Sequence, residues 1–379
     1  MGDKFDNIIV IEPNMNSLPH SEINAGFLVL IESVIESNNY TFIADKRHSS
    51  AILELTNLQK WNVINTITYN YKPVFFLLNE LILIYKIIRL YIKSSRRDIF
   101  FFMGIMPVAH IFLSFLNRFS KREIFICLHG QMEAYLKQTK IGKTKYYYRL
   151  SKFVFKSNDG IDYIIFGESI KKKLIFLFNK KKRLINIDQP YLYDKSQRHL
   201  LGTKEPYVLG FVGRFDKTKN VKDFFIFVDG LKEELLKNKI QIKIVGKVNF
   251  DIKDEYLNLF SFHTETLSKV EFENEIKNLD FVISFLNDDY YKATPSGVFF
   301  DCVKWQIPIL TLENDFVNYY FDQYGRIGEK FPNSNEMSNF VKSNIIYKDV
   351  DFKNYISDIN KMRESISVNN LKYKFINQL

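Results

Sequence analysis

The chain has few of the residues that mark small secreted or metal-binding proteins. Its 379 residues include only two cysteines, Cys127 and Cys302, which argues against a disulfide framework and fits a reducing cytoplasm. The six histidines show no close metal-ligand spacing, so we expect no metal site. The sequence also lacks a P-loop, a glycine-rich dinucleotide fingerprint and a Gly-x-Ser-x-Gly elbow, and none of the enzyme classes that these motifs typify is predicted.

No stretch is apolar enough to predict a transmembrane helix. The most apolar segment, residues 74–92, is interrupted by polar side chains. A helical projection places Asn79, Lys86, Arg89 and Lys93 on one narrow face, which describes an amphipathic helix with a wide apolar side. We predict that this helix packs within the first domain, with an interfacial helix as the alternative. The first residues contain no apolar signal region.

Length predicts two domains, because 379 residues exceed what a single core usually holds. Hydrophobic residues make up 46% and charged residues 25%, which is ordinary for a folded protein. We place an N-terminal domain at residues 1–190 and a second domain at residues 205–351. The polar, proline-bearing stretch between Asp188 and Pro206 is the expected hinge.

Positive charge is concentrated in the first half. Residues 1–190 carry 27 Lys and Arg against 16 Asp and Glu, whereas the rest of the chain carries 26 against 27. Seventeen of the basic residues fall between Arg118 and Arg183. They fit solvated helix faces, an anionic membrane surface or a nucleic acid. No recognised nucleic-acid motif accompanies the charge, so we expect no nucleic-acid partner.

The second half alternates predicted strands and helices. We expect strands at residues 207–212, 240–245, 259–263, 280–285 and 307–311, and helices at residues 221–236, at residues 270–279 and from Thr294 onward. This alternation predicts a parallel sheet with right-handed crossovers. Ligands of such sheets bind at the carboxyl ends of the strands, where Gly246 follows one strand and Gly213 follows another.

Two segments at those strand ends suggest a receptor for a nucleoside diphosphate. In the first, Arg214 and Lys219 lie five residues apart in a loop. In the second, Thr294 suits a helix N-cap and Pro295 the first helical position. The amides of Ser296, Gly297 and Val298 would then point at an anion in front of the helix. Asp301, further along, could accept hydrogen bonds from a ribose diol. An ordinary solvated loop and helix start are the alternative interpretation.

At these residues the chain resembles the carboxyl-terminal half of glycosyltransferases of the GT-B fold, most like the large family-4 type group. Members typically have Gly-Arg followed by a Lys five residues after the Arg, and these residues grip the donor diphosphate. Gly213, Arg214 and Lys219 match that pattern. The resemblance implies an α/β protein of two Rossmann-like domains facing an interdomain cleft. It also implies that a C-terminal helix, about residues 352–379, packs back on the first domain.

The family's second motif is matched only in part. It consists of two glutamates separated by seven residues, and the second position is Asp301 here. The first position falls on Ala293, so that half of the motif is missing. Ser296 and Gly297 match the turn whose amides meet the phosphates in this family.

The first half is compatible with the same resemblance. Residues 5–11 form an expected first strand, followed by a turn-rich loop containing His20 and Glu22. The strand at residues 123–128 ends at His129, and a His there is familiar in this group and faces the cleft. The resemblance therefore makes His20, Glu22 and His129 candidates for the acceptor side.

The implied activity is transfer of a sugar from a UDP-, GDP- or dTDP-sugar to a saccharide or lipid-linked saccharide, with no tightly bound cofactor and no metal. Arg214 and Lys219 would stabilise the departing diphosphate. His129 would position the sugar in a retaining enzyme or serve as the base in an inverting one. We expect a cytoplasmic protein in bacterial surface polysaccharide synthesis, with peripheral contact at the inner face of the plasma membrane as a further option. A sugar-nucleotide epimerase and a degenerate, non-catalytic member are the alternatives.

Overall fold

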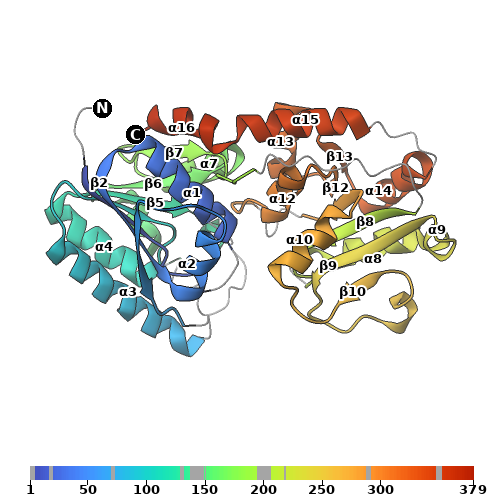
Figure 1. The fold of residues 1–379 in the computed structure, drawn as a ribbon, viewed down its shortest axis with the longest axis horizontal. Helices are drawn as coiled ribbons and strands as arrows, with labels where there is room; N and C mark the ends of the chain where they lie inside the picture. The colour runs from blue at the N-terminus through green and yellow to red at the C-terminus, as the bar shows by residue number, and fades with distance from the viewer. Residues whose placement is uncertain are drawn as a thin grey trace. The chain divides into compact units, whose positions relative to one another are not determined.

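A computed structural model gives the architecture. It describes residues 5–16, 20–69, 73–128, 132–136, 149, 151–193, 206–216, 219–286, 292–346 and 352–379. The chain divides into two compact units (Figure 1). Unit 1 comprises residues 1–192, 293–295 and 366–379, and unit 2 comprises residues 193–292 and 296–365. Each unit is built on one parallel sheet, so both are of the α/β class.

Unit 1 contains a seven-stranded parallel sheet in the order β3-β2-β1-β4-β5-β6-β7. The strands are β1 (Phe5–Ile11), β2 (Ser37–Asp45), β3 (Trp61–Thr66), β4 (Ile99–Phe102), β5 (Glu123–Leu128), β6 (Ile161–Phe166) and β7 (Leu184–Ile187). The strand order reverses between β1 and β4, the place where sheets of this kind bind ligands at the carboxyl ends of their strands.

Alternate side chains of these strands enter two separate cores, one on each face of the sheet. Val10 and Phe101 belong to the core under α1 (Ser21–Val34), α2 (Lys46–Leu53) and α16 (Val368–Ile376). Ile11 and Phe102 belong to the opposite core. That core is covered by α3 (Pro73–Lys93), α4 (Pro107–Ser120), α5 (Met132–Leu136), α7 (Glu168–Leu174) and the short helices η1 (Ser151–Lys156) and η2 (Ile175–Leu177).

The C-terminal segment differs from the single helix expected over residues 352–379. It forms two helices, α15 (Phe352–Ser365) in unit 2 and α16 in unit 1. The break falls at Ile366, which is fully buried, and at Ser367, which has an extended backbone and bridges to Tyr191. Gln378 fixes α16 to β7, since its side chain accepts from the amide of Asn186 at 2.8 Å and donates to the carbonyl at 2.9 Å. A helix that continued through residues 366–367 would lose the bridge between Ser367 and Tyr191.

Unit 2 contains a six-stranded parallel sheet in the order β10-β9-β8-β11-β12-β13. The strands are β8 (Tyr207–Val212), β9 (Ile240–Lys247), β10 (Ser261–His263), β11 (Phe281–Ser284), β12 (Ile309–Leu312) and β13 (Gly328–Phe331). The helices are α8 (Val221–Gly230), α9 (Lys232–Leu236), α10 (Lys269–Lys277), α12 (Gly297–Trp305), α13 (Asp315–Tyr324), α14 (Ser334–Phe340) and α15, with the short helices η4 (Asp254–Tyr256) and η5 (Val341–Ile345).

Two of these helices replace the single helix expected over residues 221–236. α8 ends at Gly230, and Leu231 separates it from α9. Ser338 of α14 packs so closely on Gly230 that a Cβ there would collide with its side chain. Leu231 is fully buried in the unit 2 core. The tertiary packing of these two residues therefore interrupts a helix that the sequence pattern alone would continue.

Candidate functional site

The loop after β8 depends on two glycines, Gly213 and Gly246, that lie next to each other in space. Gly213 has φ 94° and its amide donates to the carbonyl of Val245 at 2.9 Å. Gly246, one residue further along β9, has φ 148°, and an added Cβ would collide with the carbonyl oxygen of Gly213. Only glycine adopts such backbone angles without strain. The structure thus brings two predicted donor-site residues, Gly213 and Gly246, into direct contact.

The two predicted cations of this loop lie in different surroundings. The side chain of Arg214 is 67% exposed, and its Nε lies 2.5 Å from Oδ2 of Asp216. The backbone amide of Lys219 donates to the carbonyl of Asp216 at 2.9 Å. Lys219 lines a small hollow together with Val298 and the ends of β8 and β11, whereas Arg214 does not line it. Asp216, which no sequence pattern singled out, therefore pairs with the Arg214 side chain and holds the backbone at Lys219.

Helix α12 begins two residues later than expected. Its N-cap is Ser296, whose Oγ accepts from the amide of Phe299 at 3.4 Å, and Gly297 is its first residue. The prediction of Thr294 as N-cap and Pro295 as first helical residue is therefore wrong. Ser296 is almost fully buried, and serine is among the residues that cap helices well. The first helical amides that can meet an anion are those of Gly297 and Val298, directly after the N-cap Ser296.

Val298 and Asp301 lie on this helix. The Cγ2 atom of Val298 would lie 3.4 Å from a Cβ added to Gly213, so the start of α12 is next to the β8 loop. Asp301 is half-buried one turn further along. Its neighbour Cys302 is fully buried, and burial together with the charge of Asp301 raises the pKa of the Cys302 thiol well above its usual value. This thiol is therefore protonated at neutral pH.

The residue at the missing acidic position is part of a core. Ala293 is completely buried in the apolar cluster of unit 1. Its amide donates to Oε1 of Glu133 in α5 at 2.5 Å. A carboxylate at position 293 would be desolvated beside the carboxylate of Glu133, which is costly. The surroundings of Ala293 thus give a physical reason for the departure from the family motif.

A buried polar cluster lies at the carboxyl end of β1 in unit 1. The side chains of Glu12, Asn24 and His48 are nearly or fully buried. Nδ2 of Asn24 lies 3.0 Å from Oε2 of Glu12 and 2.8 Å from Nε2 of His48. No motif or spacing in the sequence points to these three residues. The one available signal was that Glu12 directly follows an apolar strand.

The predicted acceptor-side residues are only partly described. His20 precedes α1 with φ 65°, and Glu22 lies in the first turn of that helix. The pKa of His20 is lowered because protein atoms desolvate its ring; Glu12 opposes this shift and His48 adds to it. His20 therefore lies close to the buried cluster and is neutral at pH 7, able to accept a proton. His129 lies outside the described residues.

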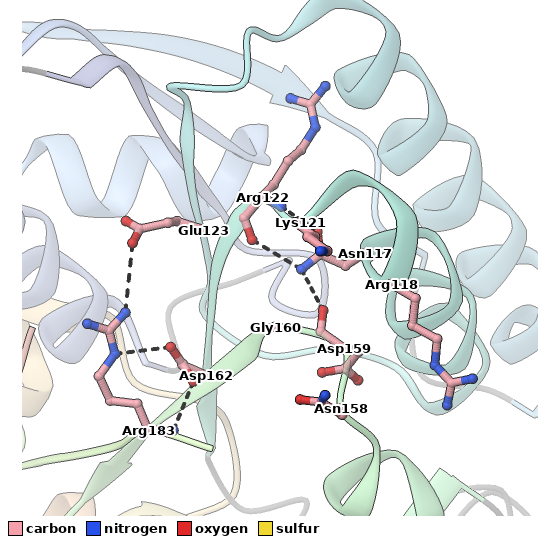
Figure 2. Close-up of a pocket in the computed structure, with 10 residues that line it drawn as sticks. All are labelled: Asn117, Arg118, Lys121, Arg122, Glu123, Asn158, Asp159, Gly160, Asp162 and Arg183. Carbon is pink, nitrogen blue, oxygen red and sulfur yellow. Dashed lines mark hydrogen bonds and ion pairs between the residues drawn. The ribbon is translucent and has the colours of Figure 1, made fainter. Parts of the chain in front are cut away.

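A second hollow lies in unit 1 at the amino ends of strands β5, β6 and β7 (Figure 2). Nε of Arg183 lies 3.0 Å from Oδ2 of Asp162, and Nδ2 of Asn117 donates to the carbonyl of Asp159 at 2.9 Å. None of the predicted site residues lines this hollow. Arg122 donates to the carbonyls of Ser95 and Tyr91 at 2.7 and 3.0 Å, so contacts around this hollow join the start of β5 to the end of α3.

Within the described parts of the chain, no helix is both long and apolar enough to cross a membrane. The same residues contain no cluster of three or more His, Cys, Asp or Glu side chains arranged to hold a metal ion.

Solved structures resemble the fold, although the sequence matches no protein-family profile and no curated protein. The lipopolysaccharide outer core galactosyltransferase WaaB, in its apo form, is 13% identical with a TM-score of 0.60, covering 98% of this chain and 100% of that chain. A structure described as trehalose-6-phosphate from E. coli bound with UDP-2-fluoro glucose is 10% identical with a TM-score of 0.62, covering 98% of both chains. TarM is 14% identical with a TM-score of 0.56, covering 79% of this chain and 58% of that chain.

These neighbours are glycosyltransferases of the GT-B fold. The chain has the GT-B fold. The predicted fold class is thereby confirmed, with parallel sheets of seven and six strands. At identities this low the likeness concerns the fold, so membership of family 4 and the roles of the site residues stay predictions.

Proposed function

We propose that the protein is a glycosyltransferase that uses a nucleotide diphosphate sugar. The observation that carries this proposal is the meeting of Gly213, Lys219 and Val298 at the carboxyl ends of β8 and β11. A cation and the first amides of a nine-residue helix, α12, converge there. Helix N-termini favour anions through unpaired amides and the helix dipole. A diphosphate matches this combination in charge and in hydrogen-bond acceptors.

In the proposed reaction the bond between the sugar and the diphosphate breaks while an acceptor oxygen bonds to the sugar carbon. Lys219 and the amides of Gly297 and Val298 would stabilise the charge that develops on the departing diphosphate. Arg214 would turn from Asp216 to the diphosphate, which exchanges one exposed ion pair for another. Asp301 would hold the ribose hydroxyls. This chemistry requires no metal and no tightly bound cofactor.

The acceptor side is proposed to lie in unit 1. His20 lies close to Glu12 and His48, so we place it beside the acceptor, where it would be the base only if the reaction inverts configuration. Glu22 and His129 remain further candidates. We propose a saccharide or lipid-linked saccharide acceptor, retention of configuration, and a role in bacterial surface polysaccharide synthesis at the inner face of the plasma membrane. WaaB, described as a lipopolysaccharide outer core galactosyltransferase, supports this choice of acceptor class.

Turnover of UDP-, GDP- and dTDP-sugars with saccharide and lipid-linked acceptors tests the proposal. We expect Arg214→Ala to lower turnover of the preferred donor by about 100-fold or more, the usual effect of removing one charge-stabilising group. Lys232→Ala is the matched control, because Lys232 is an exposed cation of the same unit in α9. Unchanged turnover in folded Arg214→Ala protein would contradict the assignment of the site. A changed sugar released without acceptor would instead identify an epimerase, and binding without turnover a degenerate member.

A further inference from the structure

The outer side of one helical layer of unit 1 exposes large apolar side chains. Four of the elements on this face of the sheet, α3, α4, η1 and η2, form a continuous series. Along it α3 contacts α4, α4 contacts η1, and η1 contacts η2. Figure 1 shows α3 and α4 side by side along the sheet. We call the solvent side of these four helices the outer face.

Helix α3 is apolar on two sides. Its inner side buries Leu83 and Ile87 in the core. Its outer side exposes a stripe that includes Leu81, Tyr85 and Ile92, with exposed fractions of 64%, 59% and 77%. These residues repeat at intervals that place them on one face of a helix. Asn79, expected on a polar side of this helix, is instead buried and bonded to the backbone of Tyr69.

The apolar stripe continues across the neighbouring helices. Phe115 and Phe119 of α4 are exposed, and their rings contact each other at a centroid distance of 5.4 Å. Phe153 of η1 and Phe176 of η2 are also more than half exposed. Nζ of Lys156 joins these last two helices by donating to the carbonyl of Phe176 at 2.7 Å. Exposed apolar area that spans several elements usually marks a docking surface.

Charge on the outer face has one sign. The four helices contain six cationic residues, Lys86, Arg89, Lys93, Arg118, Lys152 and Lys156. Their one acidic residue is Glu80, whose side chain is buried and bonded to two amides of α4. Figure 2 shows the guanidinium of Arg118, at the end of α4, pointing away from the acids of the adjacent hollow. The four helices therefore carry exposed apolar side chains together with exposed cations, such as Arg89, Lys93 and Lys152.

We propose that the outer face docks on an anionic lipid bilayer. Apolar side chains would enter the boundary between headgroups and acyl chains, and the cations would meet anionic headgroups. A second copy of the chain fits less well, because two such faces in contact would bring like charges together. α3 is held against the sheet by its inner side, so it would lie along the bilayer surface rather than cross it. This inference does not depend on the proposed transferase activity.

Vesicle sedimentation with the full chain tests the proposal. We expect binding to vesicles of equal parts phosphatidylglycerol and phosphatidylcholine, and at least about tenfold weaker binding to phosphatidylcholine alone. Combining Leu81→Gln, Ile92→Gln and Phe119→Gln should reduce binding to the anionic vesicles by at least about tenfold. These side chains are exposed, so the variant is expected to fold. The matched control is Leu236→Gln with Val270→Gln, two residues exposed to a similar degree in unit 2.

The results distinguish a lipid bilayer from a second copy of the chain as the partner of the outer face. No binding to anionic vesicles, or equal binding by the triple variant, would overturn the proposal. A wild-type dimer in sedimentation velocity that becomes monomeric in the triple variant would assign the face to a second copy instead. Arg214→Ala protein should bind vesicles as the wild type does. Unchanged transfer activity in folded Arg214→Ala protein, together with normal vesicle binding, would therefore count against the proposed function alone.

Discussion

Glu80 of α3 caps a neighbouring helix through both carboxylate oxygens. They accept from the amides of Val108 and Ala109, at 2.9 and 2.8 Å, at the start of α4. Helix α4 has Met106 as its N-cap, and that side chain forms no capping bond. Burial nevertheless raises the pKa of Glu80 from 4.5 to about 7, although the two backbone bonds act in the opposite direction. The side chain that joins the two helices thus titrates near neutral pH.

The raised pKa of Glu80 predicts a pH-dependent stability. The folded-state pKa is the higher one, so its contribution is complete below pH 4.5 and is lost as pH rises toward 7. We expect the free energy of unfolding to fall across this window by on the order of 1–3 kcal/mol. Urea unfolding of wild type and Glu80→Gln at several pH values measures this, since the variant should lack this part of the slope. Glu54→Gln, at an exposed glutamate of unit 1, is the control, and an equal slope in Glu80→Gln would contradict the account.

Some residues of the candidate site could be singled out from the sequence, and others could not. Gly213 and Gly246 could be singled out from the sequence because each follows an apolar strand. Glycine at such a place often allows a backbone angle that other residues avoid. Glu12, Asn24 and His48 could not be singled out, since they are separated in sequence and meet only after β1 and β2 pair and α1 packs on them. A buried polar cluster has no signature in local sequence pattern when each member looks like an ordinary polar residue.

At the scale of elements, the close approach of β8 and β9 is the least tolerant feature of the candidate site. Gly246 has φ 148° and no room for a Cβ beside the carbonyl of Gly213. We expect Gly246→Ala to lower the free energy of unfolding by on the order of 3 kcal/mol, from backbone strain and steric collision together. Urea unfolding is the measurement. Lys247→Ala, at an exposed residue on the same strand end, should change stability by no more than about 0.5 kcal/mol, and equal effects of the two substitutions would refute the explanation.

Elements were predicted well where periodicity decided them and less well at their ends. The strands at residues 5–11 and 123–128 have the predicted bounds. The start of α12 was misplaced because both Thr294 and Ser296 are good caps, and it is the Ser296 hydroxyl that accepts from the amide of Phe299. The polar side expected for α3 was wrong for Asn79, because a bond to the Tyr69 backbone satisfies its amide inside the protein.

At the scale of the whole molecule, the asymmetry of charge follows the division of the chain. The basic residues concentrate in the first half, and the helices of unit 1 carry them beside exposed apolar side chains. The candidate diphosphate site lies instead in unit 2, built on β8, β11 and α12. Sequence counts could predict this imbalance of charge. They could not show that the apolar residues of α3 face solvent, which depends on how the helix rotates as it packs.

Nucleoside diphosphate binding tests the central claim most directly. Thermal unfolding of the wild type with UDP, GDP and dTDP should show one nucleotide raising Tm in a concentration-dependent way, because a ligand that binds the folded state stabilises it. The rise should be largely lost in Lys219→Ala and retained in the Lys232→Ala control. If no nucleoside diphosphate raises Tm, or if Lys219→Ala responds as the wild type does, unit 2 does not bind the donor at this site.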